Sequence, residues 1–443
     1  MSFNVQGSAS LYERAYRATP SGVHSSTRAR APHPIYFSKG KGGEVWDVDG
    51  NRYMDLIMGN GAIMLGHGNE AVQQSIREAL DIGLSTGIEW EMAVEVAEQF
   101  LELVPHMDLV RFANTGTEAV IHALHVARHH TGKTRLAKME GSYHGWADEL
   151  FISCWPDMSK NGSADAPVSL AGSMGLHPAM VDSTLVLPFN DVERTQRLIE
   201  QHADDLAAVI LEPVMIDIGY IKPTADYLHM LRGLCTTHNI VLIFDELLTG
   251  FRTAPGGAQQ TYGISADLAT YGKAIANGYP MAALAGKESF MRLTEPGNGP
   301  VFVGTFNANV IPLAAAIATL PQLKDGTAQE TLNQRTQKLR SVFDEEANSL
   351  GISAQLVGEG GHLHWYFSNQ KIMDYRSATT SNAQAYAAFN QVLAEHGVLV
   401  MANPLSHHAI CLGHDDALIM ELEHIFREGL KAAASVILTK DVQ

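Results

Sequence analysis

The chain has 443 residues, of which 46% are hydrophobic and 18% are charged, so it is long enough for about two or three domains, each with its own core. With 31 Lys and Arg against 48 Asp and Glu, the formal net charge is −17, which argues against nucleic acid or an anionic membrane as the main partner. Three scattered cysteines exclude a disulfide framework and fit a reducing cytoplasm, and no segment has the roughly 18 consecutive apolar residues that a membrane helix needs.

The first part of the chain carries signals for a hairpin and for two helices. Residues 43–56 read as two short strands around Asp49-Gly50, and Asp-Gly favours the tight turn of a β-hairpin. Apolar residues recur at helical spacing over 81–103 and over 118–130, and the second stretch opens with helix-capping residues. We therefore expect a hairpin that serves as scaffold, followed by two helices.

The middle of the chain alternates between short apolar runs and helix-length stretches. Five runs predict strands, at 109–113, 134–139, 206–211, 240–244 and 268–271. Strands separated by helices indicate a mostly parallel sheet covered by helices on both faces. After about residue 325 the pattern changes to a long polar helix at 329–350, strand-like pieces near 361–367 and 398–401, and a final helix from 415.

These patterns predict an α/β protein with a smaller α+β domain. We expect a large domain over residues 56–324 and a small C-terminal domain over residues 325–443. Residues 1–55 are expected to form an N-terminal segment that joins the small domain.

Three of the predicted central strands end in a functional side chain. Glu212, Asp245 and Lys273 each follow an apolar run, about one strand-helix-strand unit apart. The carboxyl ends of parallel strands are where open sheets bind ligands, so two acids and an amine should meet at one edge. Taken singly, Asp245 also reads as a helix N-cap and Lys273 as a surface amine.

A further signal at the same edge indicates an anion site. The predicted strand 109–113 is followed by the turn Thr115-Gly116-Thr117 and a helix, so free backbone N–H groups and the helix dipole point at any ligand there. A phosphate is the natural occupant. The same residues, Thr115 and Glu118, also fit a purely structural capping box.

A phosphate site, an amine and a buried carboxylate together indicate pyridoxal 5′-phosphate. A lysine forms a Schiff base with the aldehyde of this cofactor, and a carboxylate keeps its pyridine nitrogen protonated. Tyr143, in a glycine-rich turn, is expected on one face of the ring, although it also fits an ordinary loop aromatic. Leu247, two residues after Asp245, is expected on the other face.

At this point the sequence resembles a known family, the class III pyridoxal-phosphate-dependent aminotransferases. The resemblance spans residue 22 to the final helix and is nearest to the glutamate-1-semialdehyde aminomutase branch, which includes aminotransferases for β-amino acids and D-aryl amino acids. It rests on an ordered series of motifs: Asn114-Thr-Gly-Thr-Glu-Ala119, Gly141-Ser-Tyr-His-Gly145, Glu212-Pro213, Asp245-Glu-Leu-Leu-Thr-Gly-Phe-Arg252, Gly272-Lys273 and Gly304-Thr-Phe-Asn307.

The resemblance implies a fold-type-I enzyme and a role for each matched residue. Lys273 would hold the cofactor and move protons, and Asp245 would pair with the pyridinium nitrogen. Gly116 and Thr117 would bind the phosphate, and Thr305 would reach it from the other subunit of a homodimer with shared active sites. Glu212 would belong to the hydrogen-bond network near Asp245.

The segments that would recognise the substrate match the family less closely. Arg28, in Gly22-Val-His-Ser-Ser-Thr-Arg28, matches an arginine that anchors a substrate carboxylate in the aminomutase branch, a task that suits a guanidinium; it also reads as a surface arginine. Asn60 stands where a tryptophan is usual, and Trp90 is a further pocket candidate. Ser406 takes the place of an aminomutase glutamate, which predicts negligible isomerisation of glutamate semialdehyde.

Two remaining motifs are assigned no function. Gly132-Lys133-Thr134 looks like the end of a P-loop but leaves a helix instead of entering one. The histidine pairs at 129–130, 362/364 and 407–408 have no carboxylate or cysteine partners in the pattern, so no metal site is expected.

The sequence therefore predicts a ping-pong aminotransferase that moves an amino group from an amino acid or amine to a keto acid or aldehyde. The alternatives are a glutamate-1-semialdehyde 2,1-aminomutase or an amino-acid epimerase on the same scaffold, and a pyridoxal-phosphate-binding protein without turnover.

Overall fold

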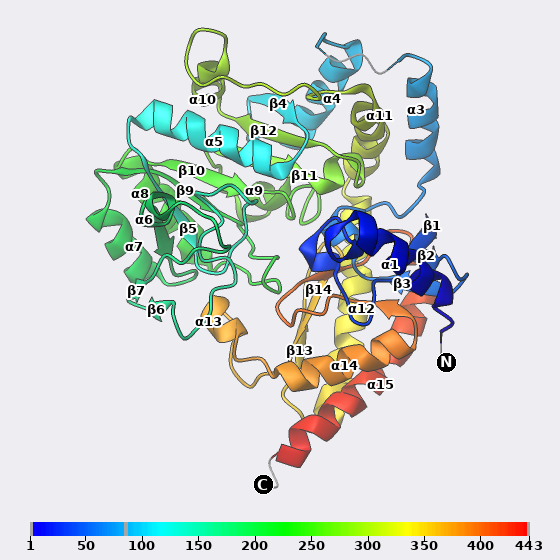
Figure 1. Ribbon diagram of the computed structural model, residues 1–443. Helices are drawn as coiled ribbons and strands as arrows, with labels where there is room; N and C mark the ends of the chain where they lie inside the picture. Colours follow the sequence, from blue (N-terminus) through cyan, green and yellow to red (C-terminus); the bar gives the residue numbers. More distant parts are fainter. Residues whose placement is uncertain (1–2, 84–86, 441–443) are drawn as a thin grey trace.

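The protein is built around a seven-stranded sheet (Figure 1). The computed structural model describes residues 3–83 and 87–440. Only β12 runs antiparallel to its neighbours, so the predicted mostly parallel sheet is confirmed. The strand order is β4 (Leu109–Ala113), β12 (Ala282–Gly286), β11 (Leu268–Gly272), β10 (Val241–Asp245), β9 (Leu206–Leu211), β5 (Arg135–Met139) and β8 (Thr184–Leu187).

Alternation along the strands explains why helices cover both faces of this sheet. In β10, Val241 and Ile243 pack in the cluster that contains α5 (Gly116–Thr131), whereas Leu242 and Phe244 pack in the main core on the opposite face. Successive side chains of a strand point to opposite faces, and both sets are buried here. The predicted α/β class with helices on both faces is therefore confirmed.

The helices near the sheet agree with those predicted from the sequence, except that one predicted helix begins at the wrong residue. The predicted helix 118–130 corresponds to α5, but the prediction of one helix over 81–103 is wrong in its first part. Helix α3 (Glu70–Leu80) ends before it, Gly83 and Gly87 have positive φ, and α4 (Glu91–Leu103) begins later; residues 84–86 lie outside the described part. The other larger helices are α7 (Val192–Gln201), α8 (Ala225–Thr237) and α11 (Val310–Thr319).

A second sheet joins the two ends of the chain. The predicted hairpin is present as β2 (Glu44–Asp47) and β3 (Arg52–Asp55), with Gly50 at φ 87°. Strand β1 (Phe37–Lys41) pairs with β2, and β15 (Val398–Leu399) pairs with β3 in parallel. Residues of the N-terminal segment thus lie beside residues of the C-terminal part, while the domain boundaries at 55/56 and 324/325 stay predictions.

The C-terminal part packs three long helices around a small antiparallel sheet (Figure 1). The predicted polar helix is α12 (Thr327–Ser349), the strand near 361–367 is β14 (His362–Tyr366), and the final helix is α15 (Asp416–Lys440). Strands β13 (Gln355–Val357) and β16 (His408–Ala409) flank β14, and α14 (Ala383–Glu395) packs on α15.

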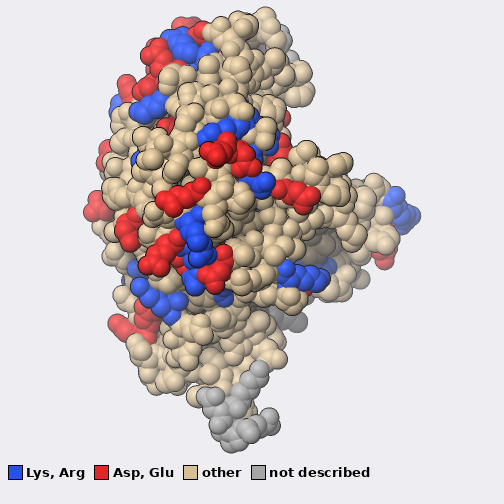
Figure 2. Space-filling model, turned by 90° about the vertical axis from the view of Figure 1, so that its left-hand side faces the viewer, with Lys and Arg blue, Asp and Glu red and all other residues tan. Residues whose placement is uncertain are grey.

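The remaining elements are short apart from helix α1 (Gln6–Ala18), and none of the described helices is long and apolar enough to cross a membrane. On the face shown in Figure 2, acidic and basic side chains are interspersed instead of gathering by sign. The short elements are α2 (Met58–Gly61), α6 (Pro178–Asp182), α9 (Gly257–Tyr262), α10 (Glu288–Met291), α13 (Tyr375–Ala378), β6 (Gly162–Ser163) and β7 (Ala166–Pro167).

Candidate active site

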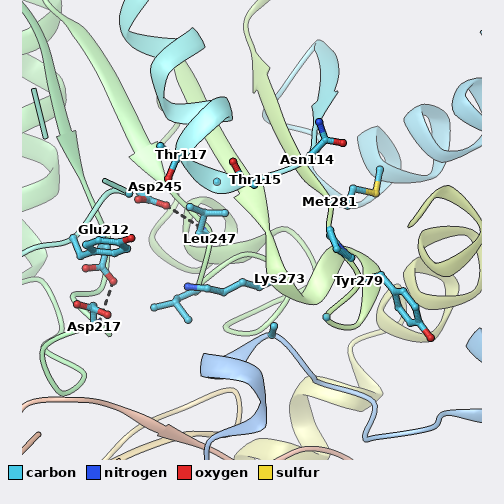
Figure 3. A pocket seen from close by; sticks show the side chains of 17 residues that line it. Asn114, Thr115, Thr117, Glu212, Asp217, Asp245, Leu247, Lys273, Tyr279 and Met281 are labelled. Atoms are coloured by element: carbon cyan, nitrogen blue, oxygen red, sulfur yellow. Dashed lines mark hydrogen bonds between the residues drawn. The ribbon is translucent and has the colours of Figure 1, made fainter. Parts of the chain in front are cut away.

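A cavity of about 280 Å³ opens where the central strands end (Figure 3). Glu212 directly follows β9, Asp245 is the last residue of β10, and Lys273 directly follows β11. The structure brings together seven of the residues singled out in the sequence: Gly116, Thr117, Tyr143, Glu212, Asp245, Leu247 and Lys273. Parallel strands deliver these side chains to one edge, as the sequence pattern predicts.

Lys273 presents a free amine to this cavity. Its backbone has φ 49°, a left-handed conformation that non-glycine residues adopt rarely and often at functional positions. Its side chain makes no hydrogen bond or ion pair with any residue that the structure describes, and burial lowers the pKa of its amine. The neutral form, which is the nucleophile, is therefore more populated than in an exposed lysine.

A second buried lysine shows the contrast. Lys138, on β5, donates to the carbonyl of Ser142 at 2.6 Å and also to the carbonyl of Ile152. These hydrogen bonds hold the loop that follows β5. Lys138 supports the site, whereas Lys273 is available to a ligand.

Asp245 is fixed by three donors, and two of the donor residues, His144 and Thr270, were not assigned a role from the sequence. Its Oδ2 lies 2.7 Å from Nδ1 of His144, and its Oδ1 accepts from the backbone of Leu247 at 3.1 Å and the hydroxyl of Thr270 at 3.3 Å. Burial lowers the pKa of His144, so its ring is neutral and Nδ1–H donates to the carboxylate. The signal for His144 was its place in the Gly141–Gly145 motif, next to Tyr143.

The start of α5 provides an anion site. Thr115 and Glu118 form the capping box: Glu118 Oε2 accepts from the backbone of Asn114 at 2.8 Å and of Thr115 at 3.0 Å, and Thr115 Oγ1 accepts from the backbone of Glu118 at 3.2 Å. The next two N–H groups, of Gly116 and Thr117, have no acceptor among the described residues. The structural and functional interpretations of this turn therefore hold together: the box shapes a turn whose free donors face the cavity.

Two glycines keep the walls of the site close together. A Cβ on Gly145, which has φ 89°, would lie 2.5 Å from Oγ1 of Thr117, and a Cβ on Gly116 would lie 2.5 Å from Cδ1 of Leu247. At Gly145 the positive φ and the backbone Cα of Thr117 at 3.0 Å disfavour any side chain. At Gly116, by contrast, a side chain would require Leu247 to move. The space between Leu247 and the anion site depends on this close approach.

Two acids, Glu212 and Asp217, line the other side of the cavity, and only Glu212 was predicted from the sequence. Glu212 Oε2 accepts from the backbone of Ile216 at 3.1 Å and of Asp217 at 3.2 Å, while its Oε1 has no partner in the described chain. Asp217 also lines the cavity, and its Oδ2 accepts from Nε1 of Trp155 at 3.0 Å. Trp155 in turn stacks on Tyr143, with ring centroids 5.4 Å apart. Loop residues such as Asp217 and Trp155 have no periodicity, so the sequence pattern did not reveal them.

The four residues expected to recognise the substrate, and Thr305, expected at the phosphate of the partner subunit, do not line the cavity that this single chain forms. Arg28 is exposed in a short 3-10 turn (Ser26–Arg28), and Asn60 is exposed on α2 with φ 56°. Trp90 is the N-cap residue of α4, Thr305 lies in an exposed loop, and the backbone carbonyl of Ser406 lies 3.1 Å from Nδ1 of His364. Their predicted roles stay predictions.

The residues present fit pyridoxal phosphate. The free N–H groups of Gly116 and Thr117 suit its phosphate, the amine of Lys273 suits its aldehyde, and the carboxylate of Asp245 suits its pyridine nitrogen. The walls formed by Tyr143 and Leu247 leave a slot for a flat ring. No group of three or more metal-ligating side chains occurs in the ranges 3–83 and 87–440.

Comparison with known proteins agrees with this geometry. The chain is 34% identical to the glutamate-1-semialdehyde 2,1-aminomutase of Persephonella marina, over 94% of its own length and 96% of the relative's. It is 36% identical to the glutamate-1-semialdehyde 2,1-aminomutase 2 of Brevibacillus brevis, over 93% and 95%. Among solved structures, an omega-transaminase from Sphaerobacter thermophilus superposes with a TM-score of 0.91 at 32% identity, covering 96% and 97% of the two chains.

Fold and site together define a pyridoxal-phosphate-dependent enzyme of fold type I. The profile of the class-III aminotransferases matches residues 25–414. The chain belongs to the class-III aminotransferase family. The fold class, the family and the cofactor expected from the sequence are thereby confirmed.

Proposed function

We propose that this protein moves an amino group between a small carboxylate-bearing substrate and pyridoxal phosphate held at the Lys273 cavity. The observation that carries the proposal is the free amine of Lys273, which shares one cavity with the Asp245 carboxylate and the free N–H groups of Gly116 and Thr117. The cofactor supplies an aldehyde that condenses with amines and a pyridine ring that accepts electrons.

Each residue of the site has a distinct task in this proposal. Gly116 and Thr117 bind the phosphate through their backbone N–H groups, and Asp245, oriented by His144, holds the proton at the pyridine nitrogen. Tyr143 and Leu247 fix the plane of the ring from its two sides. With the ring fixed, the protein determines which bond of the substrate carbon stands perpendicular to it.

Lys273 is the residue that moves protons. Because burial lowers the pKa of its amine, it releases a proton more readily than an exposed lysine and accepts one again at its Nζ atom. Glu212 contributes through the hydrogen bonds that hold the backbone of Ile216 and Asp217 in place. No other described lysine lines this cavity.

The test of this assignment uses the visible absorbance that a lysine-bound cofactor produces. The full chain mixed with pyridoxal phosphate should turn yellow, and Lys273→Ala should abolish the band. Lys41→Ala, which removes an exposed lysine from β1, is the matched control and should keep it. A wild-type chain that stays colourless with added cofactor would overturn the proposal.

The comparisons support the aminomutase alternative better than the intermolecular aminotransferase that the sequence analysis put first. The relatives from Persephonella marina and Brevibacillus brevis are both aminomutases, matched over more than nine tenths of the chain. We therefore propose the intramolecular shift of an amino group, of the glutamate-1-semialdehyde 2,1-aminomutase type, as the first reaction to test.

Aminotransfer between two substrates is the second candidate. It is favoured by Ser406, which supplies no carboxylate where the resemblance implies one, and by the similarity to the omega-transaminase structure. Incubation with glutamate 1-semialdehyde alone, followed by analysis of the product, separates the two reactions. Turnover without any second substrate supports the aminomutase, whereas turnover only with an amino donor and a keto-acid acceptor supports the aminotransferase.

We also propose that the active unit is a homodimer in which Thr305 completes the phosphate site of the partner subunit. Thr305 lies outside the cavity of its own chain, and its neighbours Val301, Val303 and Phe306 are exposed by 71%, 69% and 61%. Such an apolar run on a surface favours association. Sedimentation should give the mass of a dimer, and Thr305→Ala should weaken cofactor binding without changing that mass.

A further inference from the structure

Three carboxyl groups face Lys273, and their hydrogen bonds differ. Figure 3 shows the amine end of Lys273 directed toward the side of the cavity that holds Glu212 and Asp217, with Asp245 on the β10 side. None of the three forms an ion pair with Lys273 among the described residues. They act on the amine through their charge across the cavity, so their protonation determines the local field.

Two of the three acids are poor candidates for controlling the charge of Lys273. Asp245 is held by His144, Leu247 and Thr270, and its proposed task is at the pyridine nitrogen. Glu212 is buried, with 3% of its surface exposed, and burial raises its pKa well above the ordinary value. Burial thus favours the neutral form of this carboxyl, which carries less charge than an exposed glutamate.

Asp217 differs from both. It accepts a single side-chain hydrogen bond, from Trp155, and its Oδ1 has no partner in the described chain. It is only partly buried and lines the cavity. Burial raises its pKa to about 6, so this carboxyl is charged at neutral pH and becomes neutral in mild acid.

We propose that Asp217 is a positioning residue that sets the protonation state of Lys273 by its charge across the cavity. The inference rests on the proposed function, since it concerns the pH range in which Lys273 serves as nucleophile and proton carrier. When Asp217 is charged, it stabilises the ammonium of Lys273; when it takes up a proton, Lys273 releases its own more readily. The cavity of about 280 Å³ has room for water between the two groups.

Other titratable or charged groups lie around this pair. They are Lys138, Tyr143, Cys154, Glu212, Asp245, Arg252, His362 and His407. Burial lowers the pKa of the two histidines and raises that of the tyrosine and the cysteine, so these four groups are neutral near neutral pH. Asp217 differs from these four because its raised pKa lies in mild acid.

The experiment measures the reactivity of Lys273 directly, in the full-length chain without cofactor. Limited acetylation with acetic anhydride over a range of pH, with the Lys273 peptide quantified by mass spectrometry, gives the fraction of neutral amine. Asp217→Asn keeps the size of the side chain and an acceptor for Trp155. Near neutral pH it should raise the acetylation rate of Lys273 about three- to tenfold, a shift of up to about one pKa unit.

Three further variants make the result specific. Glu212→Gln should change the rate less than Asp217→Asn, because burial favours the protonated form of Glu212. Asp204→Asn changes an exposed acid outside the cavity and should leave the rate unchanged. Trp155→Phe removes the hydrogen bond that lowers the pKa of Asp217. The acetylation rate of Lys273 in this variant should therefore exceed that of wild type near neutral pH and equal it in alkali. A merely structural role of Trp155 does not produce this pattern.

The outcomes separate this inference from the proposed function. An unchanged Lys273 profile in Asp217→Asn, or a larger effect of Glu212→Gln, overturns the role of Asp217. Should Asp217→Asn fail to fold, a Trp155→Phe profile equal to that of wild type overturns it instead. A chain that shows the expected Lys273 profiles but no absorbance band with pyridoxal phosphate contradicts the proposed function and leaves the electrostatic pairing intact.

Discussion

The hydrogen bond between His144 and Asp245 offers the sharpest test of how this site holds its cofactor. The two side chains are 0% and 2% exposed, and Nδ1 of His144 lies 2.7 Å from Oδ2 of Asp245. His144→Leu leaves the carboxylate with two donors, the backbone of Leu247 and the hydroxyl of Thr270. The charged carboxylate is then less stabilised and less firmly oriented toward the pyridine nitrogen.

The expected magnitude follows from the loss of that one bond. A hydrogen bond to a charged group contributes about 1.5–3 kcal/mol, and each 1.4 kcal/mol is about tenfold in a dissociation constant. The apparent Kd for pyridoxal phosphate should therefore rise about ten- to a hundredfold, measured by titration of the visible absorbance. His144→Asn is the matched control, because its amide N–H can replace Nδ1–H, and it should lose much less affinity.

One result would refute this reasoning. If His144→Leu binds the cofactor as tightly as wild type and differs only in its urea unfolding midpoint, then His144 stabilises the fold and does not orient Asp245.

Further predictions concern the walls of the cavity. Thr115→Ala should lower the free energy of unfolding by about 1 kcal/mol through loss of the cap of α5, measured by urea unfolding, with Thr115→Ser close to wild type; equal midpoints for all three would contradict the cap. Gly145→Ala should cost about 1–3 kcal/mol, because φ is 89° and the new Cβ meets Oγ1 of Thr117 at 2.5 Å, and titration should show weaker cofactor binding than in wild type. For Asp217, ionisation opposes folding because its pKa rises from 3.8 to about 6. Asp217→Asn should therefore be the more stable chain above that pKa, by up to about 3 kcal/mol, with the difference vanishing as the pH falls below the ordinary value; a difference that grows in acid would contradict this sign.

The parts of the fold that the sequence predicted are those with a strong apolar pattern. Strands β9 and β10 are continuous buried runs, which few other structures accommodate. Strand β12, Ala-Ala-Leu-Ala-Gly, was missed because small residues with low strand preference give no such signal. The predicted helix start at Asp81 is wrong because Gly83 and Gly87, both with positive φ, interrupt the helix although the apolar spacing continues across them.

The sequence predicted those site residues that stand at the end of a strand or in a recognisable turn. Lys273 and Asp245 could be found because a strand determines where its last residue lies. Asp217 and Trp155 meet only through loop geometry, at 3.0 Å, and no local pattern in the sequence determines such a contact. The positions of Arg28 and Thr305 depend on surfaces outside the cavity of one chain, which a pattern along one chain does not describe.

Some polar groups without partners among the described residues lie at or beside the cavity, while others, such as Gln99 Oε1 and Gln329 Oε1, belong to residues that do not line it. Buried polar groups are usually satisfied, and each one left without a partner costs about 1–3 kcal/mol. In the part of the chain that the structure describes, His144 Nε2 and Glu212 Oε1 are buried without partners, beside the free amine of Lys273 and the free N–H groups at the start of α5. Stability alone would favour pairing or removing these groups. The free donors of Lys273, Gly116 and Thr117, together with Glu212 Oε1, fit a cavity that receives a polar ligand, with the fold stabilised elsewhere by its apolar core.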